Sequence, residues 1–334
     1  MLYVSTRNKT ESYTAYRTLH ENYAPDGGMY VPFRLPTFTP EEINALISKP
    51  FSEIIAQILN VFFSCRLTSW DVEFCIGRYP YKLTVLNQKI TVAELWHNTQ
   101  NTYAHMVQCL YERHCTDLPS KKSPTQWFLI ATEIAVLFGI CGELYKKGIE
   151  NFDVSLSDES FLHPLAVSYA RRMGLSVNMI ICACGESGYM WSFLHRGDVG
   201  AEKSTASDSV ERMVYDVLGV DGVDSYLNTC KNHSIFSLPE ETLASVNSGI
   251  FTSVVGAGRI NYLINSLYRT NSYLADPETA LSYGALQDYR ALTGENQHTL
   301  LLSGCNPLLS ADRLANAIGC TKEKLRTISG LCRE

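Results

Sequence analysis

The sequence predicts an α/β protein, and three observations lead to this prediction. Residues 51–63 repeat apolar side chains at helical spacing, which is typical of a helix with one buried face. Residues 153–156 and 177–183 are short apolar runs that predict strands. Between them, residues 161–173 predict a helix that ends before Gly174. The order strand, helix, strand indicates a parallel βαβ unit.

The remaining elements follow from the same signals. Residues 1–35 predict short strands and turns, with a turn at 24–28 and a strand at 29–32. Thr39 and Pro40 are an N-cap and a first helical residue, so a helix begins there. A buried strand is expected at 298–302. Further helices are expected over residues 99–114, 126–147, 208–218, 259–268, 278–292 and 310–318.

The amino-acid composition is typical of a globular protein and does not favour a nucleic-acid-binding or membrane-spanning one. The 334 residues are 46% hydrophobic and 19% charged, which is typical of a globular chain of about two domains. A net charge of -6 does not predict a nucleic-acid surface. The most apolar stretch, residues 128–141, is short for a membrane span and contains Glu133. Without an apolar leader, and with eleven cysteines expected to be free thiols, we expect a cytoplasmic protein.

Isolated motifs do not predict a metal or nucleotide site. Cys182 and Cys184 face one way on a strand, but a metal site needs three or four ligands, so they are interpreted as small buried residues. The glycines at 256 and 258 lack the third glycine of a dinucleotide loop, and 185–188 lacks the spacing of a nucleophile elbow. The histidines form no close helical pair.

The amino-terminal residues resemble those of threonine synthases. Tyr3-Val4-Ser5-Thr6-Arg7 and, after Leu19, Ala24-Pro25-Asp26-Gly27-Gly28-Met29-Tyr30-Val31-Pro32 are similar to the start of that family. Pro50-Phe51-Ser52-Glu53-Ile54 and Glu94-Leu95-Trp96-His97 resemble its next two motifs, and weaker similarities follow at residues 161–175, 273–277 and 301–307. The resemblance covers most of the chain.

The resemblance implies a fold-type II enzyme that uses pyridoxal phosphate (PLP) to convert O-phosphohomoserine to threonine, in amino-acid biosynthesis. It implies a threonine-synthase-like amino-terminal domain over residues 1–90. Residues 91–334 would then be a reduced form of the PLP-dependent large domain. Such chemistry needs a lysine amine to hold the cofactor and a glycine-rich loop to hold its phosphate.

The residues that carry this chemistry in the family are replaced here. The resemblance places Ala104 at the Schiff-base lysine, and no lysine lies between Lys89 and Lys121. Lys121 and Lys122 are interpreted as a solvated connector. The phosphate loop falls on residues 158–162, where two acids would repel a phosphate. The positions that correspond to the former cofactor and substrate cleft are His97, Asn98, Thr99, Asp158, Glu159, Ser160, Cys182, Cys184 and Asn306.

The resemblance also implies a deletion. In the family a small lid domain follows the lysine-bearing helix, and here only residues 115–126 stand in its place. The chain therefore looks like a truncated and degenerate family member. Apolar surface left by the loss of the lid would be filled by large side chains such as Phe161, Leu162 and Trp191, or covered by a second copy. We expect a homodimer, with a protein partner as the alternative.

Three functional hypotheses follow. The first is a pseudoenzyme that has lost PLP-dependent catalysis, binds no PLP and keeps a binding or interaction role, with no nucleic acid, membrane or metal. In it, His97 is either a polar group facing the old cleft or a structural histidine. The second is an active PLP-dependent threonine synthase-like lyase. The third is new chemistry by Cys182, Cys184 and Cys305.

Overall fold

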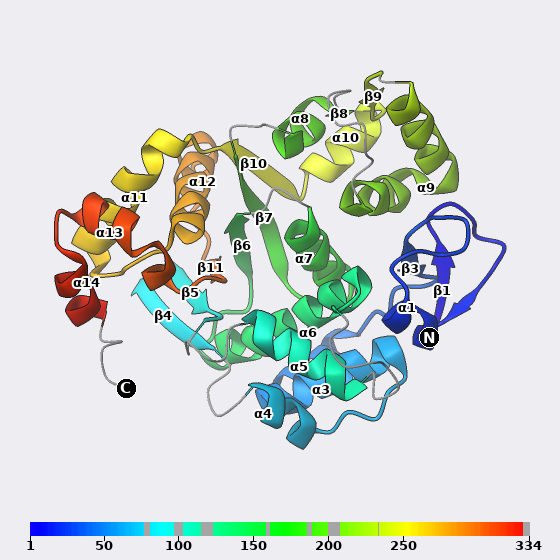
Figure 1. Cartoon of the computed structure of the whole chain (residues 1–334), viewed down its shortest axis with the longest axis horizontal. Helices are drawn as coiled ribbons and strands as arrows, with labels where there is room; N and C mark the ends of the chain where they lie inside the picture. The colour runs from blue at the N-terminus through cyan, green and yellow to red at the C-terminus, as the bar shows by residue number, and fades with distance from the viewer. Residues whose placement is uncertain are drawn as a thin grey trace.

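The computed structural model describes residues 1–76, 81–96, 103–114, 123–157, 161–185, 189–199, 208–232 and 234–329. Its centre is a six-stranded sheet in the order β10-β7-β6-β11-β5-β4 (Figure 1). Neighbours are parallel, except that β4 is antiparallel to β5. The strands are β4 (Lys82–Asn87), β5 (Ile90–Glu94), β6 (Phe152–Ser157), β7 (Val177–Cys184), β10 (Ile250–Val254) and β11 (Thr299–Ser303). The predicted α/β class and the parallel βαβ unit are confirmed.

Helices cover both faces of this sheet (Figure 1). Side chains alternate along β7, so Ile180 and Cys182 pack with α6 and α7, while Ile181 and Ala183 pack with α11 and α12. The larger helices are α2 (Pro40–Ile47), α3 (Phe51–Phe63), α4 (Ser69–Ile76), α5 (Tyr103–His114), α6 (Gln126–Lys146), α7 (Leu162–Arg172), α8 (Tyr189–Arg196), α9 (Asp208–Lys231), α10 (Glu240–Asn247), α11 (Ala257–Asn271), α12 (Pro277–Thr293), α13 (Ala311–Ile318) and α14 (Lys322–Ser329).

Most helices lie where the sequence predicts them, and the shorter elements were missed. The capping box of Thr39 and Glu42 begins α2, and α3 has the predicted bounds. Helix α9 extends past the predicted residue 218, with a kink at Gly219, where φ is 72°. The missed elements have too few residues to show a period: they are α1 (Ala15–His20), η1 (Pro307–Ser310), β8 (Asp198–Val199) and β9 (Phe236–Ser237), together with α4, α8, α10, α14, β4 and β10.

The amino-terminal residues form a separate small sheet in the order β2-β1-β3, with strands β1 (Leu2–Ser5), β2 (Tyr13–Thr14) and β3 (Tyr30–Pro32). The end of its central strand is tied to α9, because the buried Glu211 accepts a hydrogen bond from Thr6 Oγ1, directly after β1. Arg7 Nη2 lies 2.8 Å from Glu211 Oε2. Strand β4 precedes residue 90 yet pairs with β5, so the large sheet begins before the predicted domain boundary.

The predicted turn at residues 24–28 uses its two glycines for different reasons. Gly27 has a φ of 80°, a conformation that residues with a Cβ rarely adopt. Gly28 has no positive φ, but a Cβ there would lie 2.2 Å from Ser5 Oγ. The second glycine is therefore required by the close approach of β1, which only the tertiary structure shows.

A Gly28→Ala variant is expected to lose about 1–3 kcal/mol of unfolding free energy, because the methyl group displaces the Ser5 hydroxyl from its hydrogen bonds to Asp26 Oδ1 and Arg7 N. Gly258→Ala is the matched control, since a Cβ at that helical position meets no atom within 4 Å. The control should be neutral or more stable by up to about 1 kcal/mol. Urea denaturation measures both, and equal stabilities would contradict the close approach.

Helix α6 is the one described helix long and apolar enough to cross a membrane by length and composition alone. In the folded chain, 89% of its most apolar window is buried, which is the environment of a core helix. It packs between the amino-terminal elements and the sheet, and Trp127, Phe128 and Phe138 are fully buried. The core of the amino-terminal region and one face of the sheet are therefore continuous.

Candidate functional site

A small cavity lies at the carboxyl ends of β5, β6 and β11, the edge of a parallel sheet where ligands usually bind. Its volume is about 70 Å³. Apolar side chains from the strand ends form one part of the lining, and polar side chains from α6, α7 and α12 form the rest. The lining residues are Leu95, Glu133, Leu156, Ser157, His163, Glu278, Ser282, Leu302 and Gly304.

A short polar contact in this cavity joins α6 to α7. His163 Nδ1 lies 2.6 Å from Glu133 Oε2, and the Glu133 side chain is 7% exposed. A carboxylate at this distance accepts the Nδ1 proton and fixes the orientation of the imidazole ring. Glu133 is the acid that interrupts the most apolar stretch of the sequence, and it lines the cavity together with Ser157, the last residue of β6.

Asp276 precedes α12, the helix that contributes Glu278 and Ser282 to the cavity lining. It is buried at the N-cap of α12 and accepts hydrogen bonds from the backbone nitrogens of Glu278 and Thr279. Ser303 Oγ, at the end of β11, donates to Asp276 Oδ2 at 3.1 Å and accepts from Trp96 Nε1 at 3.0 Å. This chain of hydrogen bonds holds β11, α12 and the end of β5 together.

Asp276, Glu278 and Cys305 lie within 4.8 Å of one another, which is close enough for a shared cation. The oxygens of Asp276 are already occupied, since they cap α12 and accept from Thr279 and Ser303. Burial, with Glu278 beside it, raises the pKa of the Cys305 thiol to about 11. Helix capping therefore explains this cluster without a metal ion.

Alkylation should reveal the protonated state of Cys305. Iodoacetamide reacts with thiolates, and a pKa near 11 instead of 9 lowers the thiolate fraction at pH 8 by about 100-fold. Modification of Cys305 should therefore be slow at pH 8 and accelerate as the pH rises towards 11. Peptide mass spectrometry measures this, with Cys305→Ser as the blank. Fast modification at pH 8 would contradict it and would favour the hypothesis of cysteine chemistry.

Phe161 begins α7 at the place where the resemblance puts the phosphate loop. It is a non-glycine residue with a φ of 64°, it makes no side-chain cap, and it is fully buried. Its ring packs edge-to-face against Phe193 at 5.4 Å between centroids. Of the three side chains expected to fill the cleft, Phe161 is fully buried, whereas Leu162 and Trp191 are half-buried. The N-cap position of α7 is therefore occupied by a buried aromatic residue.

The structure brings few of the predicted site residues together. Cys182 and Cys184 are buried in the core beneath α6 and α7, as small hydrophobic residues would be. Asn306 is buried and caps the short helix η1 through its side chain. Ala104 lies in α5, and its side chain is outside the described part of the structure. Six other predicted positions lie outside the described residues: His97, Asn98, Thr99, Asp158, Glu159 and Ser160.

Sequence reasoning missed Glu133, His163 and Glu278 as cavity residues. The sequence did contain a clue for Glu133, which is an acid within an otherwise apolar helix. A buried acid nearly always has a partner, so this position could have been predicted to make a polar contact. His163 comes 30 residues later in the chain, and no sequence spacing connects the two. Glu278 lies in the first turn of α12, where acidic residues are common because they stabilise the helix dipole. The sequence therefore gave no reason to expect it at a cavity.

Known proteins are similar to this chain both in sequence, over part of its length, and in fold. The family profile described as "Threonine synthase N terminus" matches residues 2–79. Threonine synthase from Pseudomonas aeruginosa is 31% identical over 105 residues, which are 29% of this chain and 22% of that protein. Human threonine synthase-like 1 is 23% identical over 158 residues, 42% of this chain and 21% of that protein. These alignments span about a fifth of each relative.

The fold is similar over nearly the whole chain. A crystal structure of PLP-bound threonine synthase from Brucella melitensis has a TM-score of 0.82 at 18% identity, covering 96% of this chain and 91% of that one. The yeast threonine synthase structure has a TM-score of 0.80 at 14% identity, covering 98% and 94%. The predicted fold is confirmed: the chain has the fold of the threonine synthases, and its residues 2–79 match the amino-terminal profile of that family.

Proposed function

We propose that this chain is a threonine synthase-like protein that has lost PLP-dependent catalysis and keeps a binding role. The observation that carries the proposal is the cavity at the carboxyl edge of the sheet. Pockets for small ligands and cofactors measure roughly 300–1,000 Å³, whereas this cavity measures about 70 Å³. No lysine is among its lining residues within the described part of the chain.

The charge of the lining supports the same proposal. Glu133 and Glu278 both line the cavity, and the described lining offers neither lysine nor arginine to balance them. A phosphate dianion beside two partly desolvated carboxylates is repelled by several kcal/mol. The buried ring of Phe161 adds a steric obstacle at the start of α7. These residues do not fit PLP.

An active PLP-dependent lyase is the second candidate, and the similarity of the fold to PLP-bound threonine synthase favours it. Titration of the purified chain with PLP separates the two. Under the proposal, no absorbance band of a lysine adduct forms, borohydride traps no PLP on the protein, and O-phosphohomoserine releases no phosphate. A trapped adduct on one lysine together with phosphate release would overturn the proposal in favour of the lyase.

A further inference from the structure

Two cysteines face each other between α4 and α5, outside the lining of the cavity at the sheet edge. Cys75 lies in the last turn of α4 and is 2% exposed, whereas Cys109 lies in the middle of α5 and is half-buried. Both are free thiols, and the Cys75 thiol forms a hydrogen bond with the Cys109 thiol. Two reduced sulfur atoms are therefore in contact, although they are 34 positions apart in the sequence.

The register of the two helices explains this contact. Helices α4 and α5 pack against each other (Figure 1), and Arg113 Nε lies 3.2 Å from Asp71 Oδ1. Cys75 follows Asp71 by four residues, which is about one helical turn. Cys109 precedes Arg113 by the same interval, so each cysteine lies on the same face of its helix as the ion pair. The two helices therefore run antiparallel, with the cysteines opposite each other.

Aromatic contacts hold the same register. The Arg113 Cζ atom lies 4.9 Å from the ring centroid of Trp70 and 4.3 Å from that of Phe74, both on α4. These cation–π contacts add to the ion pair with Asp71 in joining the two helices. A disulfide forms only where two Cβ atoms can approach to about 4 Å, so a fixed register that opposes two cysteines favours it.

The two thiols differ in their access to solvent. Burial, with the Cys109 thiol beside it, raises the pKa of Cys75, so this thiol stays protonated at neutral pH. Cys109 is the more exposed of the two, and an oxidant from solvent meets it first. Cys75 lies behind it, within reach of an oxidised Cys109 sulfur. An accessible thiol beside a second, resolving thiol is the usual arrangement of a redox-sensitive pair.

We propose that Cys75 and Cys109 form a reversible disulfide when the protein meets a peroxide. The Cys109 sulfur attacks one oxygen of hydrogen peroxide, the O–O bond breaks, and Cys109 becomes a sulfenic acid while one water leaves. The Cys75 sulfur then attacks the Cys109 sulfur and the S–O bond breaks. The departing hydroxyl takes the Cys75 proton and leaves as the second water. Two thiols and one peroxide thus give one disulfide and two waters.

The disulfide would tie α4 to α5 and close the chain segment that contains β4 and β5. Leu95, which directly follows β5, lines the cavity at the sheet edge, so the constrained segment forms part of that cavity. A cross-link restricts the unfolded chain more than the folded one, and the oxidised protein is expected to melt about 3–6 °C above the reduced protein. The thiol pair is independent of whether the cavity binds PLP.

Oxidation of the whole reduced chain with equimolar hydrogen peroxide tests the proposal. N-ethylmaleimide then blocks the remaining thiols, and peptide mass spectrometry should find a cross-link between Cys75 and Cys109 that dithiothreitol removes. In Cys75→Ala, Cys109 should instead persist as a sulfenic acid that dimedone labels. The matched control Cys230→Ala removes another half-buried thiol, on α9, and should form the same cross-link as the parent.

Three results would overturn the proposal. In the first, the folded parent chain keeps both thiols reduced, or dimedone labels Cys109 without a cross-link to Cys75. In the second, the cross-link forms only in urea, where α4 and α5 no longer pack together. In the third, the oxidised and reduced chains melt at the same temperature, so the cross-link constrains nothing. The parent chain alone gives each of these results, so the test does not depend on the folding of a variant.

Discussion

Ala104→Lys is expected to form no stable covalent adduct with PLP, although the resemblance places this residue at the Schiff-base lysine. A new amine in α5 does not remove the two carboxylates, Glu133 and Glu278, that line the cavity. At about 4 Å and an effective dielectric constant near 20, each phosphate–carboxylate pair costs about 4 kcal/mol, or roughly a thousand-fold in affinity. Absorbance with added PLP and mass spectrometry after borohydride reduction measure the adduct.

The matched variant adds Glu133→Gln and Glu278→Gln to Ala104→Lys. If repulsion is the main obstacle, this triple variant should take up more PLP than the single one. A stable adduct in the single variant would show that the cavity tolerates the phosphate, and the proposed loss of cofactor binding would then be wrong. Circular dichroism of each variant controls for folding.

Trp127→Ala is expected to lose about 3–5 kcal/mol of unfolding free energy, a larger loss than that expected for Gly28→Ala. Trp127 is 1% exposed, and its ring packs against Tyr3, Phe62 and Tyr169. Its Nε1 donates to the Tyr3 hydroxyl at 3.0 Å, and that hydroxyl donates to the Phe62 carbonyl at 2.8 Å. Removing the ring opens a cavity between β1, α3 and α6.

Chemical denaturation measures this loss, with two controls. Trp127→Phe keeps most of the packing and loses the hydrogen bond, so its destabilisation should be smaller. Trp70→Ala removes a ring that is 62% exposed, and it should cost less than about 1 kcal/mol. A loss below about 1.5 kcal/mol in Trp127→Ala would mean that the amino-terminal region contributes little to the common core.

Local chemistry decided much of the secondary structure. The capping box of Thr39 and Glu42 begins α2, and the apolar period of residues 51–63 sets the bounds of α3. The βαβ unit of β6, α7 and β7 follows from two apolar runs around one amphipathic helix. In each case the determining residues lie within one or two helical turns, or within one strand, so their spacing in the sequence is their spacing in the fold.

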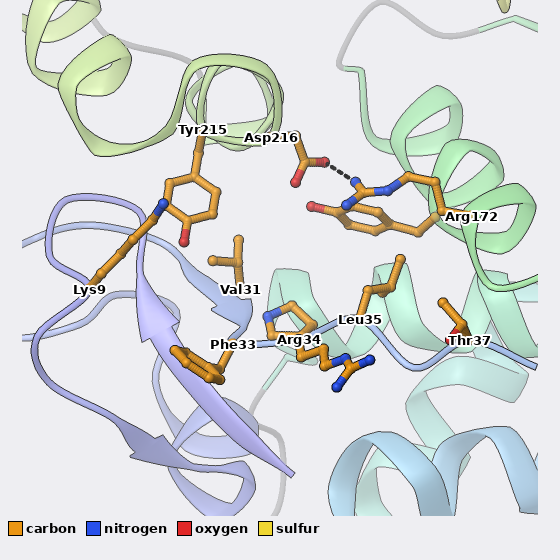
Figure 2. Close-up of a pocket in the computed structure, with 11 residues that line it drawn as sticks. Lys9, Val31, Phe33, Arg34, Leu35, Thr37, Arg172, Tyr215 and Asp216 are labelled. Atoms are coloured by element: carbon orange, nitrogen blue, oxygen red, sulfur yellow. Dashed lines mark ion pairs between the residues drawn. The ribbon is translucent and has the colours of Figure 1, made fainter.

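Tertiary structure decided the positions that matter for function. Glu133 and His163 meet because α6 and α7 lie side by side, and Trp127 meets Tyr3 across 124 residues of sequence. The late strand β11 lies in the middle of the sheet, between β5 and β6, which places Leu302 and Gly304 at the cavity. Lys9, Tyr169 and Tyr215 come from three separate segments and line one pocket between the amino-terminal region, α7 and α9 (Figure 2). Such contacts depend on how helices and strands pack against one another. The side-chain periodicity of one segment shows which of its faces is buried, but not which other segment covers that face.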